Sequence, residues 1–349
     1  MSESPIPRIA LLAVRETSSM VLYGLNDVLT AVGTVYPDMV MAQPGNALLD
    51  VKIVAADKAP FRCSGNVLVE PHAAVSDVGE VDVVVVCDIY TPADTPPRDR
   101  YPREVDWLRR VHSGGALVSS VCSGSLLLAE AGLLDGRQCA GHWAYRDLFR
   151  DEYPRVEFSA SSILNLESAA DGVVTAGSST AWHDLALYLI ARLCGPEQAL
   201  QTAKIYLLAG HEDGQLPFAA MTRIIQKSDA VISHCQSWIA ANYASSNPVA
   251  AMAERSGLNQ RTFARRFRSA TGYLPIEYVH AIRIEEAKRI IEAETGALDG
   301  VGYEVGYDDP TFFRRLFKRG TGLTPAAYRR KFTRILEYGK SHTGAWAWR

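Results

Sequence analysis

The sequence of 349 residues is 48% apolar and 21% charged, a composition that predicts a folded globular protein and excludes long disordered regions. No run of 18 uncharged apolar residues occurs, and the N-terminus lacks the apolar core of a secretion signal, so we expect a cytoplasmic protein without a membrane contact. The six cysteines are scattered without metal-binding spacing, which favours a reducing compartment and predicts neither a metal site nor a cofactor.

The net charge of −3 conceals an asymmetry between the two ends of the chain. Residues 229–349 contain 18 Lys and Arg against 12 Asp and Glu, whereas residues 1–228 contain 18 basic and 27 acidic residues. A basic C-terminal third on an acidic body favours a polyanionic partner for that third, although solvated basic faces are also common. The length exceeds that of a single hydrophobic core, so two domains are expected.

Apolar runs in the first 195 residues predict the strands of a parallel sheet that is buried on both faces. These runs cover residues 9–14, 51–55, 81–87, 116–121 and 173–176. Helical patterns follow at residues 123–131 and 182–194. The alternation of strands and helices predicts a three-layer α/β domain of the flavodoxin-like kind.

A cysteine, Cys122, comes directly after the predicted strand 116–121 and before a helix. Such a strand-to-helix turn exposes the sulfur at the end of the sheet, where Ser123 and the helix N-terminus favour a thiolate or an anion. His142 lies 20 residues further along and is a candidate partner for the thiol. The alternative interpretation is a buried apolar cysteine and a hydrogen-bonded core histidine.

The C-terminal third contains a helical pair that is typical of DNA-binding proteins. A short helix at 249–255 and a Gly257 turn precede a second helix at 260–269, with Asn259 as its N-cap. Phe263 and Phe267 share one face of this helix, so we expect them in the core and the basic residues outside. This layout predicts a helix-turn-helix unit.

The same pattern returns about 50 residues later. Helices are predicted at 298–305 and 309–319, and the aromatic, glycine and proline positions of the first unit recur in register. One apolar-patterned helix, 275–294, joins the two units and would hold them at a fixed separation. We therefore expect the two second helices to enter the major groove about 34 Å apart, one turn of the duplex.

Candidate DNA contacts are the polar and basic residues on the outer faces of these two second helices. They are Gln260, Arg261, Arg265, Arg268, Asp309, Thr311, Arg314, Arg315 and Lys318. Gln260 and Arg261 stand at a helix start, which favours base edges, whereas the other cations suit phosphates as well. A merely solvated basic face is the alternative for any single one of them.

Residues 229–334 resemble an AraC-type DNA-binding domain. The stretch SGLNQRTFARRFRSATGYLPIEYVHAIRIEEAK is similar to the first unit and linker helix of that family, and VGYDDPTFFRRLFKRGTGLTPAAYRRKF is similar to its second unit. One difference is Gly302, where the family usually has a small helix former. Because glycine costs up to ~1 kcal/mol in a helix interior, we expect a softer second unit.

Roughly residues 8–210 resemble the PfpI-like members of the glutamine amidotransferase-like superfamily, and more narrowly the GlxA-type regulators. The stretches SSVCSGSLLLAEAGLLDGRQCAGHW and TAGSSTAWHDLALYLIARLCG provide this resemblance. It implies that Cys122 and His142 match the nucleophile and its partner, that Ser123 lines the same pocket, and that Asp184 is the acidic residue retained after the last strand.

Two differences from catalytic members argue against an enzyme. Catalytic members place an acidic residue after the first strand, where this chain has Ser18, Ser19 and Met20, with Glu16 as a doubtful substitute. They also have a Gly-Gly turn that supplies an oxyanion donor, where this chain has residues 88–90. Because such a donor is worth ~3 kcal/mol of barrier, we expect a degenerate pocket rather than a catalytic site.

The sequence therefore predicts a transcription regulator that binds double-stranded DNA, responds to a small-molecule effector and forms a homodimer. GlxA-type relatives imply an amino acid or a betaine-like compound as effector. The expected segments are a sensor domain at 1–210, a linker at 211–228, a DNA-binding domain at 229–334 and a tail at 335–349. Two alternatives use Cys122: a hydratase or amidohydrolase, and a thiol redox sensor.

Overall fold

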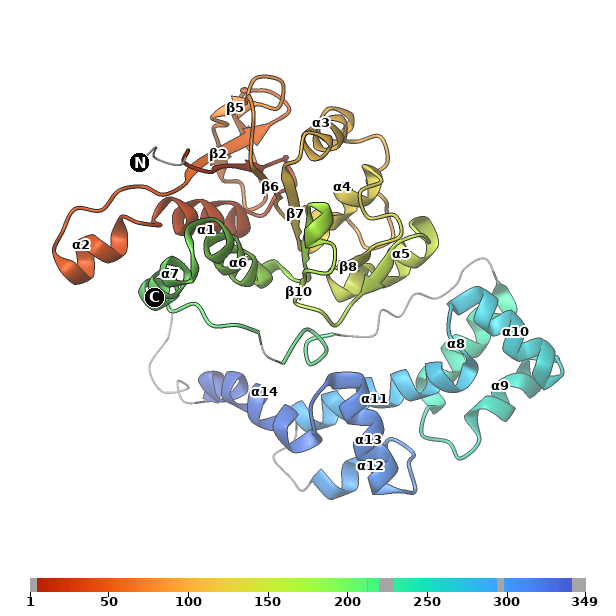
Figure 1. The fold of residues 1–349 in the computed structure, drawn as a ribbon. Helices are drawn as coiled ribbons and strands as arrows, with labels where there is room; N and C mark the ends of the chain where they lie inside the picture. Colours follow the sequence, from red (N-terminus) through yellow and green to blue (C-terminus); the bar gives the residue numbers. More distant parts are fainter. Residues whose placement is uncertain (1–4, 212, 220–228, 294–297, 341–349) are drawn as a thin grey trace, which may run out of the picture. The chain divides into compact units, whose positions relative to one another are not determined.

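The computed structural model describes residues 5–211, 213–219, 229–293 and 298–340. The chain divides into two compact units, Met1–Gln215 and Leu216–Arg349, each of which is described by itself (Figure 1). None of the helices in these described residues is long and apolar enough to cross a membrane. The four predicted segments stay a prediction, because most of the expected linker and residues 341–349 lie outside the described residues.

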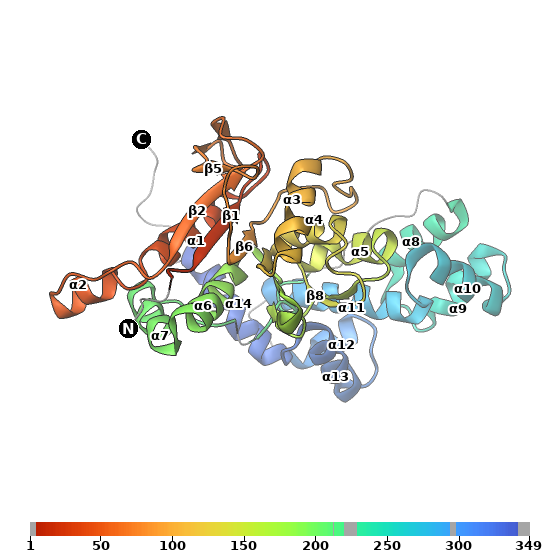
Figure 2. The same cartoon turned by 45° about the horizontal axis from the view of Figure 1, so that its top comes forward.

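The first unit contains a seven-stranded sheet in the order β10-β11-β7-β6-β1-β2-β5. Its strands are β1 (Arg8–Leu12), β2 (Asp50–Ala55), β5 (Ala73–Ala74), β6 (Val83–Val86), β7 (Leu117–Val121), β10 (Leu164–Asn165) and β11 (Val173–Ala176). All neighbours pair in parallel except β10 and β11. Figure 2 shows β1 and β2 side by side along this sheet. The predicted α/β fold with a mainly parallel sheet is confirmed.

Helices cover both faces of the sheet (Figure 1). One apolar core lies between the sheet and α1 (Ser19–Thr30) and α6 (Trp182–Cys194). A second core lies between the other face and α3 (Pro102–Ser113), α4 (Ser125–Glu130) and α5 (Arg146–Glu152). The continuous run of β6 is buried at every position, because each face of the strand meets a helix layer.

Shorter elements complete the first unit. They are α2 (Val35–Met41), α7 (Pro196–Tyr206), the strand pairs β3 (Phe61–Arg62) with β4 (Leu68–Val69) and β8 (Gln138–Ala140) with β9 (Glu157–Ser159), and single turns η1 (Cys122–Gly124), η2 (Trp143–Tyr145), η3 (Ala169–Asp171) and η4 (Ser179–Ala181). The turns η1 and η4 both follow the carboxyl ends of parallel strands. Ligands of open α/β sheets usually bind at this edge.

The second unit is helical and contains the two predicted helix-turn-helix pairs. The first repeat comprises α8 (Ala230–Asn242), α9 (Pro248–Ser256) and α10 (Gln260–Thr271); the linker helix is α11 (Pro275–Ala293); the second repeat comprises η5 (Leu298–Gly300), α12 (Val301–Glu304), α13 (Pro310–Thr321) and α14 (Pro325–Lys340). Phe263, Phe267, Phe313 and Phe317 are at most 3% exposed, which confirms them as core residues.

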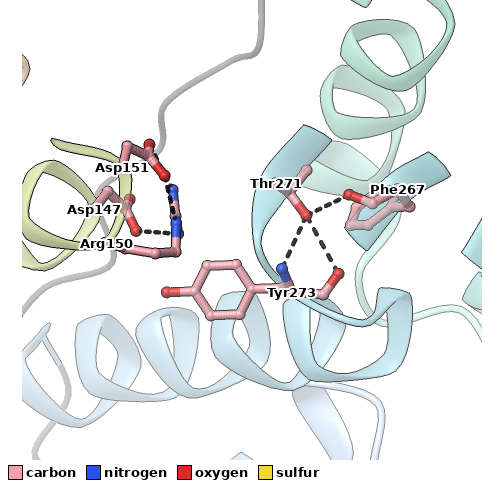
Figure 3. Close-up of polar contacts among 6 residues, drawn as sticks. All are labelled: Asp147, Arg150, Asp151, Phe267, Thr271 and Tyr273. Carbon is pink, nitrogen blue, oxygen red and sulfur yellow. Dashed lines mark hydrogen bonds and ion pairs between the residues drawn. The ribbon is translucent and has the colours of Figure 1, made fainter. Parts of the chain in front are cut away.

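The two repeats agree in their turns and helix ends as well as in their cores. The Thr271 hydroxyl donates to the Phe267 carbonyl at 2.8 Å and accepts from the Tyr273 amide at 3.2 Å, which closes the end of α10 (Figure 3). Fifty residues later, Thr321 does the same with Phe317 and Leu323, at 2.8 and 3.2 Å. Side-chain hydrogen bonds of this kind satisfy backbone groups that a helix end leaves without partners.

Gly302 has a packing role that the sequence did not indicate. It is buried in α12, and a methyl group on it would stand 3.1 Å from the Phe313 ring. The glycine therefore lets α12 approach α13 closely. Overpacking costs typically ~1–3 kcal/mol, which is comparable to or larger than the ~1 kcal/mol that alanine gains in a helix. The close contact thus offsets at least part of the helix propensity that the glycine costs.

Candidate cysteine site and nucleic-acid interface

Cys122 occupies a strained turn between β7 and α4. Its φ is +55°, in the left-handed region that non-glycine residues rarely adopt, and such strain costs on the order of 1–3 kcal/mol. The residue is 5% exposed. The predicted elbow is present, but it places the sulfur in a buried position.

Two side chains from neighbouring strand ends stand beside the thiol. The Ser179 hydroxyl, from η4 after β11, lies 3.5 Å from Cys122 Sγ and donates to Asp88 Oδ2 at 3.0 Å. Asp88 follows β6, and its other carboxylate oxygen is buried with no hydrogen-bond partner among the described residues. Burial raises the pKa of the Cys122 thiol to about 11, and the carboxylate of Asp88 adds to the rise. The site therefore favours a neutral thiol.

The backbone amide that would stabilise an oxyanion beside Cys122 is already used. The Ile89 amide donates to Ser123 Oγ at 3.0 Å, and the Ser123 hydroxyl donates back to the Ile89 carbonyl at 2.5 Å. Ser123 therefore fastens the turn after β6 to the cysteine turn. A reacting oxygen could gain this donor only by displacing the serine.

The histidine and the acid that the family resemblance implies make other contacts. His142 Nδ1 accepts from the Ala144 amide at 3.3 Å, and the His142 ring packs on Trp143, with 4.9 Å between the ring centroids. Burial lowers the pKa of His142, so the ring is held neutral. Asp184, in the first turn of α6, hydrogen-bonds His211 Nδ1 through Oδ2 at 2.7 Å. The structure thus places Ser179 and Asp88 beside Cys122, whereas the hydrogen bonds given above for His142 and Asp184 go to other partners.

On the second unit, the nine candidate DNA contacts all lie exposed on α10 and α13 or at the start of α13. Exposure is necessary for contact with a duplex, and the contacts themselves stay a prediction. Asp309 has a local role as well, because its carboxylate accepts from the Thr311 amide at 2.8 Å and caps α13. Asn259 caps α10 in the same way through the Thr262 amide.

Ion pairs distinguish the arginines of these two helices. Arg266, on α10 but outside the candidate set, binds Asp229 through two hydrogen bonds of 2.7 and 3.0 Å. Arg314, on α13, lies 3.1 Å from Asp299, and both side chains are largely exposed. Exposed ion pairs contribute at most about 1 kcal/mol, so the Arg314 guanidinium can exchange this partner for a phosphate at little cost.

A buried arginine on α11 ties the two repeats together. Arg283 is 6% exposed and donates to the carbonyls of Tyr243, Gly306 and Ser245 at 2.7, 2.6 and 2.8 Å. Tyr243 and Ser245 follow the end of α8 in repeat one, whereas Gly306 lies in the turn of repeat two. The guanidinium also lies over the Tyr307 ring, 4.9 Å from its centroid. The linker helix is therefore fixed to both repeats.

Comparison with known proteins agrees with both halves of this description. A model of the DJ-1/PfpI family matches residues 19–192, and a model described as a helix-turn-helix domain matches residues 252–331. The chain combines a DJ-1/PfpI domain with an AraC-type helix-turn-helix domain. Both resemblances found in the sequence are confirmed.

Three curated proteins illustrate this likeness. The HTH-type transcriptional regulator CdhR of Pseudomonas aeruginosa is 25% identical over 292 residues, which cover 78% of this chain and 80% of CdhR. The regulator GlxA of Rhizobium meliloti is 27% identical over 239 residues, covering 64% of this chain and 68% of GlxA. The isonitrile hydratase of Pseudomonas putida is 28% identical over 182 residues, covering 52% of this chain and 76% of the enzyme.

Four residues of the first unit that the sequence analysis did not name as site residues make polar contacts at or near the candidate site. They are Asp88, Ser179, His211 and Gln215. Asp88 could have been identified from the sequence, because it comes shortly after a buried strand. This is the position at which parallel sheets place functional side chains. His211 and Gln215 belong to a segment without periodicity, so no signal identified them.

Gln215 anchors the end of the DJ-1/PfpI domain to loops near Cys122. It is 2% exposed, and its amide nitrogen donates to the carbonyls of Gly141 and Ser162 at 3.0 and 2.8 Å. A methyl group on Gly177 would stand 2.1 Å from this nitrogen, so the glycine is needed for the fit. Gly141 precedes His142 and Gly177 precedes the Ser178–Ser179 turn. The chain leaving this domain is therefore fixed to the walls of the cysteine site.

Asp88 should make the stability of the DJ-1/PfpI domain depend on pH. Burial raises its pKa to about 6, above the ordinary 3.8, so its favourable contribution is complete below pH 3.8 and is lost as the pH rises through 6. Relative to Asp88→Asn, the wild type should lose about 2 kcal/mol of unfolding free energy between pH 4 and pH 7.5. Urea unfolding of both proteins at the two pH values measures this difference; a constant difference would contradict the raised pKa.

Proposed function

We propose that the protein is a sequence-specific transcription regulator that binds double-stranded DNA through α10 and α13. The single observation that supports this most is the pair of matched helices whose basic faces are exposed while their phenylalanines fill the core. The relatives named as transcriptional regulators span both domains of the chain, which favours the same role here. As a regulator it acts in the cytoplasm, and we expect a homodimer because most soluble oligomers are twofold.

Binding of the purified chain to DNA tests this function. A duplex selected from a random-sequence pool is the specific probe, and an unselected duplex is the reference. The logarithm of the binding constant should fall linearly with the logarithm of salt, with a slope of about −0.9 for each phosphate contacted. Equal affinity for the two duplexes, or an affinity independent of salt, would contradict the proposal.

The DJ-1/PfpI domain is proposed to be the sensor of a small-molecule effector, an amino acid or a betaine-like compound. The anchoring of Gln215 supports this division of roles, because a change in the loops at Gly141 or Ser162 would be felt where the chain leaves the domain. The turn at Cys122, Ser123 and Asp88 is a candidate wall of the effector pocket, although Cys122 itself is only 5% exposed.

An enzymatic role for Cys122 is the alternative, favoured by the likeness to isonitrile hydratase. The raised thiol pKa and the occupied Ile89 amide argue against it, because a nucleophilic cysteine needs a thiolate and its reaction an oxyanion donor. A redox sensor needs an exposed thiolate as well, and the 5% exposure of Cys122 disfavours that role.

Alkylation of Cys122 separates these roles. At pH 7.5 a thiol with a pKa of about 11 is ionised roughly once in several thousand molecules, against about one in ten for a free cysteine. Iodoacetamide should therefore label Cys122 at least ~100-fold more slowly in the folded protein than in the urea-unfolded chain, as followed by peptide mass spectrometry. Equal labelling rates in the folded and unfolded protein would favour the enzyme and redox alternatives. Loss of the regulatory response in Cys122→Ser would favour them as well.

A further inference from the structure

A second cavity of the DJ-1/PfpI domain lies at the carboxyl ends of β1 and β2, beside the start of α3. Its volume is about 400 Å³. Ala13, Ala55 and Phe61 give it an apolar wall, and Tyr101 and Glu104 stand on the side of α3. The charged residues Arg15, Glu16, Asp57 and Arg100 line it as well. This is the sheet edge at which α/β domains bind small molecules, and a site of this size suits a small metabolite.

Glu104 is the unusual residue of this cavity. It is 7% exposed and lines the cavity, yet only its own backbone amide hydrogen-bonds its carboxylate among the described residues. Burial is the main cause that raises its pKa, whereas its own backbone amide and the charge of Arg103 lower the pKa. Arg103 lies within ion-pair distance of Asp57 and not of Glu104. A buried carboxylate without an ion-pair partner costs free energy, so its place at a cavity wall points to a cation supplied from outside.

The other carboxylates at this cavity already have partners. Glu16 binds the Arg100 guanidinium at 2.6 Å and accepts from the Tyr101 hydroxyl at 2.8 Å. Asp57 lies 3.8 Å from Arg103 on the surface. Among the described cavity-lining acids, Glu104 is thus the one that lacks a cation within ion-pair distance.

We propose that this cavity binds a small molecule with a primary ammonium group. The N–H groups of the ammonium would donate hydrogen bonds to the Glu104 carboxylate. The apolar wall takes the alkyl part of the ligand. A quaternary ammonium group has no N–H to donate, so of the two effector classes considered above the cavity favours the amine over the betaine-like compound. The identification of this ligand as the effector rests on the proposed function, whereas its binding to the cavity is independent of that function.

The loop from Glu16 to Ser18 connects this cavity with the cysteine site. The Glu16 carbonyl accepts from the Tyr90 amide at 2.8 Å, and the Ser18 amide donates to the Asp88 carbonyl at 3.3 Å. Glu16 lines the cavity, while Thr17 forms a β-bridge with Ile89 in the turn after β6. A ligand that displaces Glu16 therefore moves the turn that Ser123 fastens to Cys122.

Calorimetric titration of the full-length protein tests the site, with n-butylamine as the probe and tetramethylammonium as a cation without N–H donors. Wild-type protein should bind n-butylamine saturably and tetramethylammonium at least ~10-fold more weakly. Glu104→Gln should lose at least ~10-fold in n-butylamine affinity, whereas the exposed control Glu167→Gln should bind as wild type does.

The outcomes are distinguishable. No saturable binding of n-butylamine to wild type, equal binding of the two cations, or unchanged binding by Glu104→Gln each overturns the site. Because the two cations are compared on the wild-type protein, the test does not depend on the variant folding. DNA affinity is measured separately. If the protein binds n-butylamine but not DNA, the proposed regulator function is wrong and the amine site is supported. If the protein binds DNA but not n-butylamine, the amine site is wrong and the regulator function is supported.

Discussion

Replacing Arg265 and Arg314 together with alanine should reduce affinity for the selected duplex about 100-fold or more while leaving the fold intact. Both side chains are exposed on the recognition helices, and the one described ion pair between them and the protein is the surface contact of Arg314 with Asp299. A good base contact contributes ~1–3 kcal/mol, so losing one in each repeat removes most of the preference over unselected DNA. Fluorescence anisotropy at several salt concentrations measures both the affinity and the slope.

A control with the same loss of charge separates specific contacts from general attraction. Arg266→Ala with Arg289→Ala also removes two cations, but these side chains pair with Asp229 and Glu286 rather than facing outward alone. This control should bind the selected duplex within about threefold of wild type at moderate salt. Equal losses in the two double variants would contradict the assignment of the outer faces of α10 and α13 to DNA.

The helix-turn-helix pairs were predictable because their determinants are local. Phe263 and Phe267 stand one turn apart, Asn259 is an N-cap type directly before them, and the whole arrangement recurs 50 residues later. The parallel sheet was predictable for the same reason, since a run such as residues 81–87 can be satisfied only where both faces of a strand are covered.

The site contacts were not predictable, because they join residues distant along the chain. Asp88 appears in the sequence only as a lost Gly-Gly turn, yet it approaches Ser179, 91 residues later, beside the cysteine. Asp184 has the residue type that the family resemblance implies, but its partner is His211 in a segment without pattern. Which side chains meet at the end of a sheet depends on the order of the strands, and local sequence periodicity does not determine that order.

Arg283→Met should destabilise the helical unit by about 3–5 kcal/mol, because it leaves three carbonyls from both repeats without their buried donor. Gly306 supports this interpretation: a methyl group there would stand 2.8 Å from the guanidinium, so the turn is shaped around it. The exposed control Arg289→Met on the same helix should change stability by less than about 1 kcal/mol. Thermal and urea unfolding measure both effects, and an unchanged stability of Arg283→Met would contradict the role of this arginine.

The same variant should also weaken DNA binding in a way that differs from loss of the surface arginines. All nine candidate contacts remain in Arg283→Met, so the salt slope should stay at the wild-type value while affinity falls about tenfold. The fall follows because two repeats no longer fixed to one rod must be ordered on binding, and that ordering costs conformational entropy. A shallower salt slope would instead mean that one repeat no longer contacts the duplex. An unchanged affinity would mean that Arg283 is not needed to position the two repeats for DNA binding.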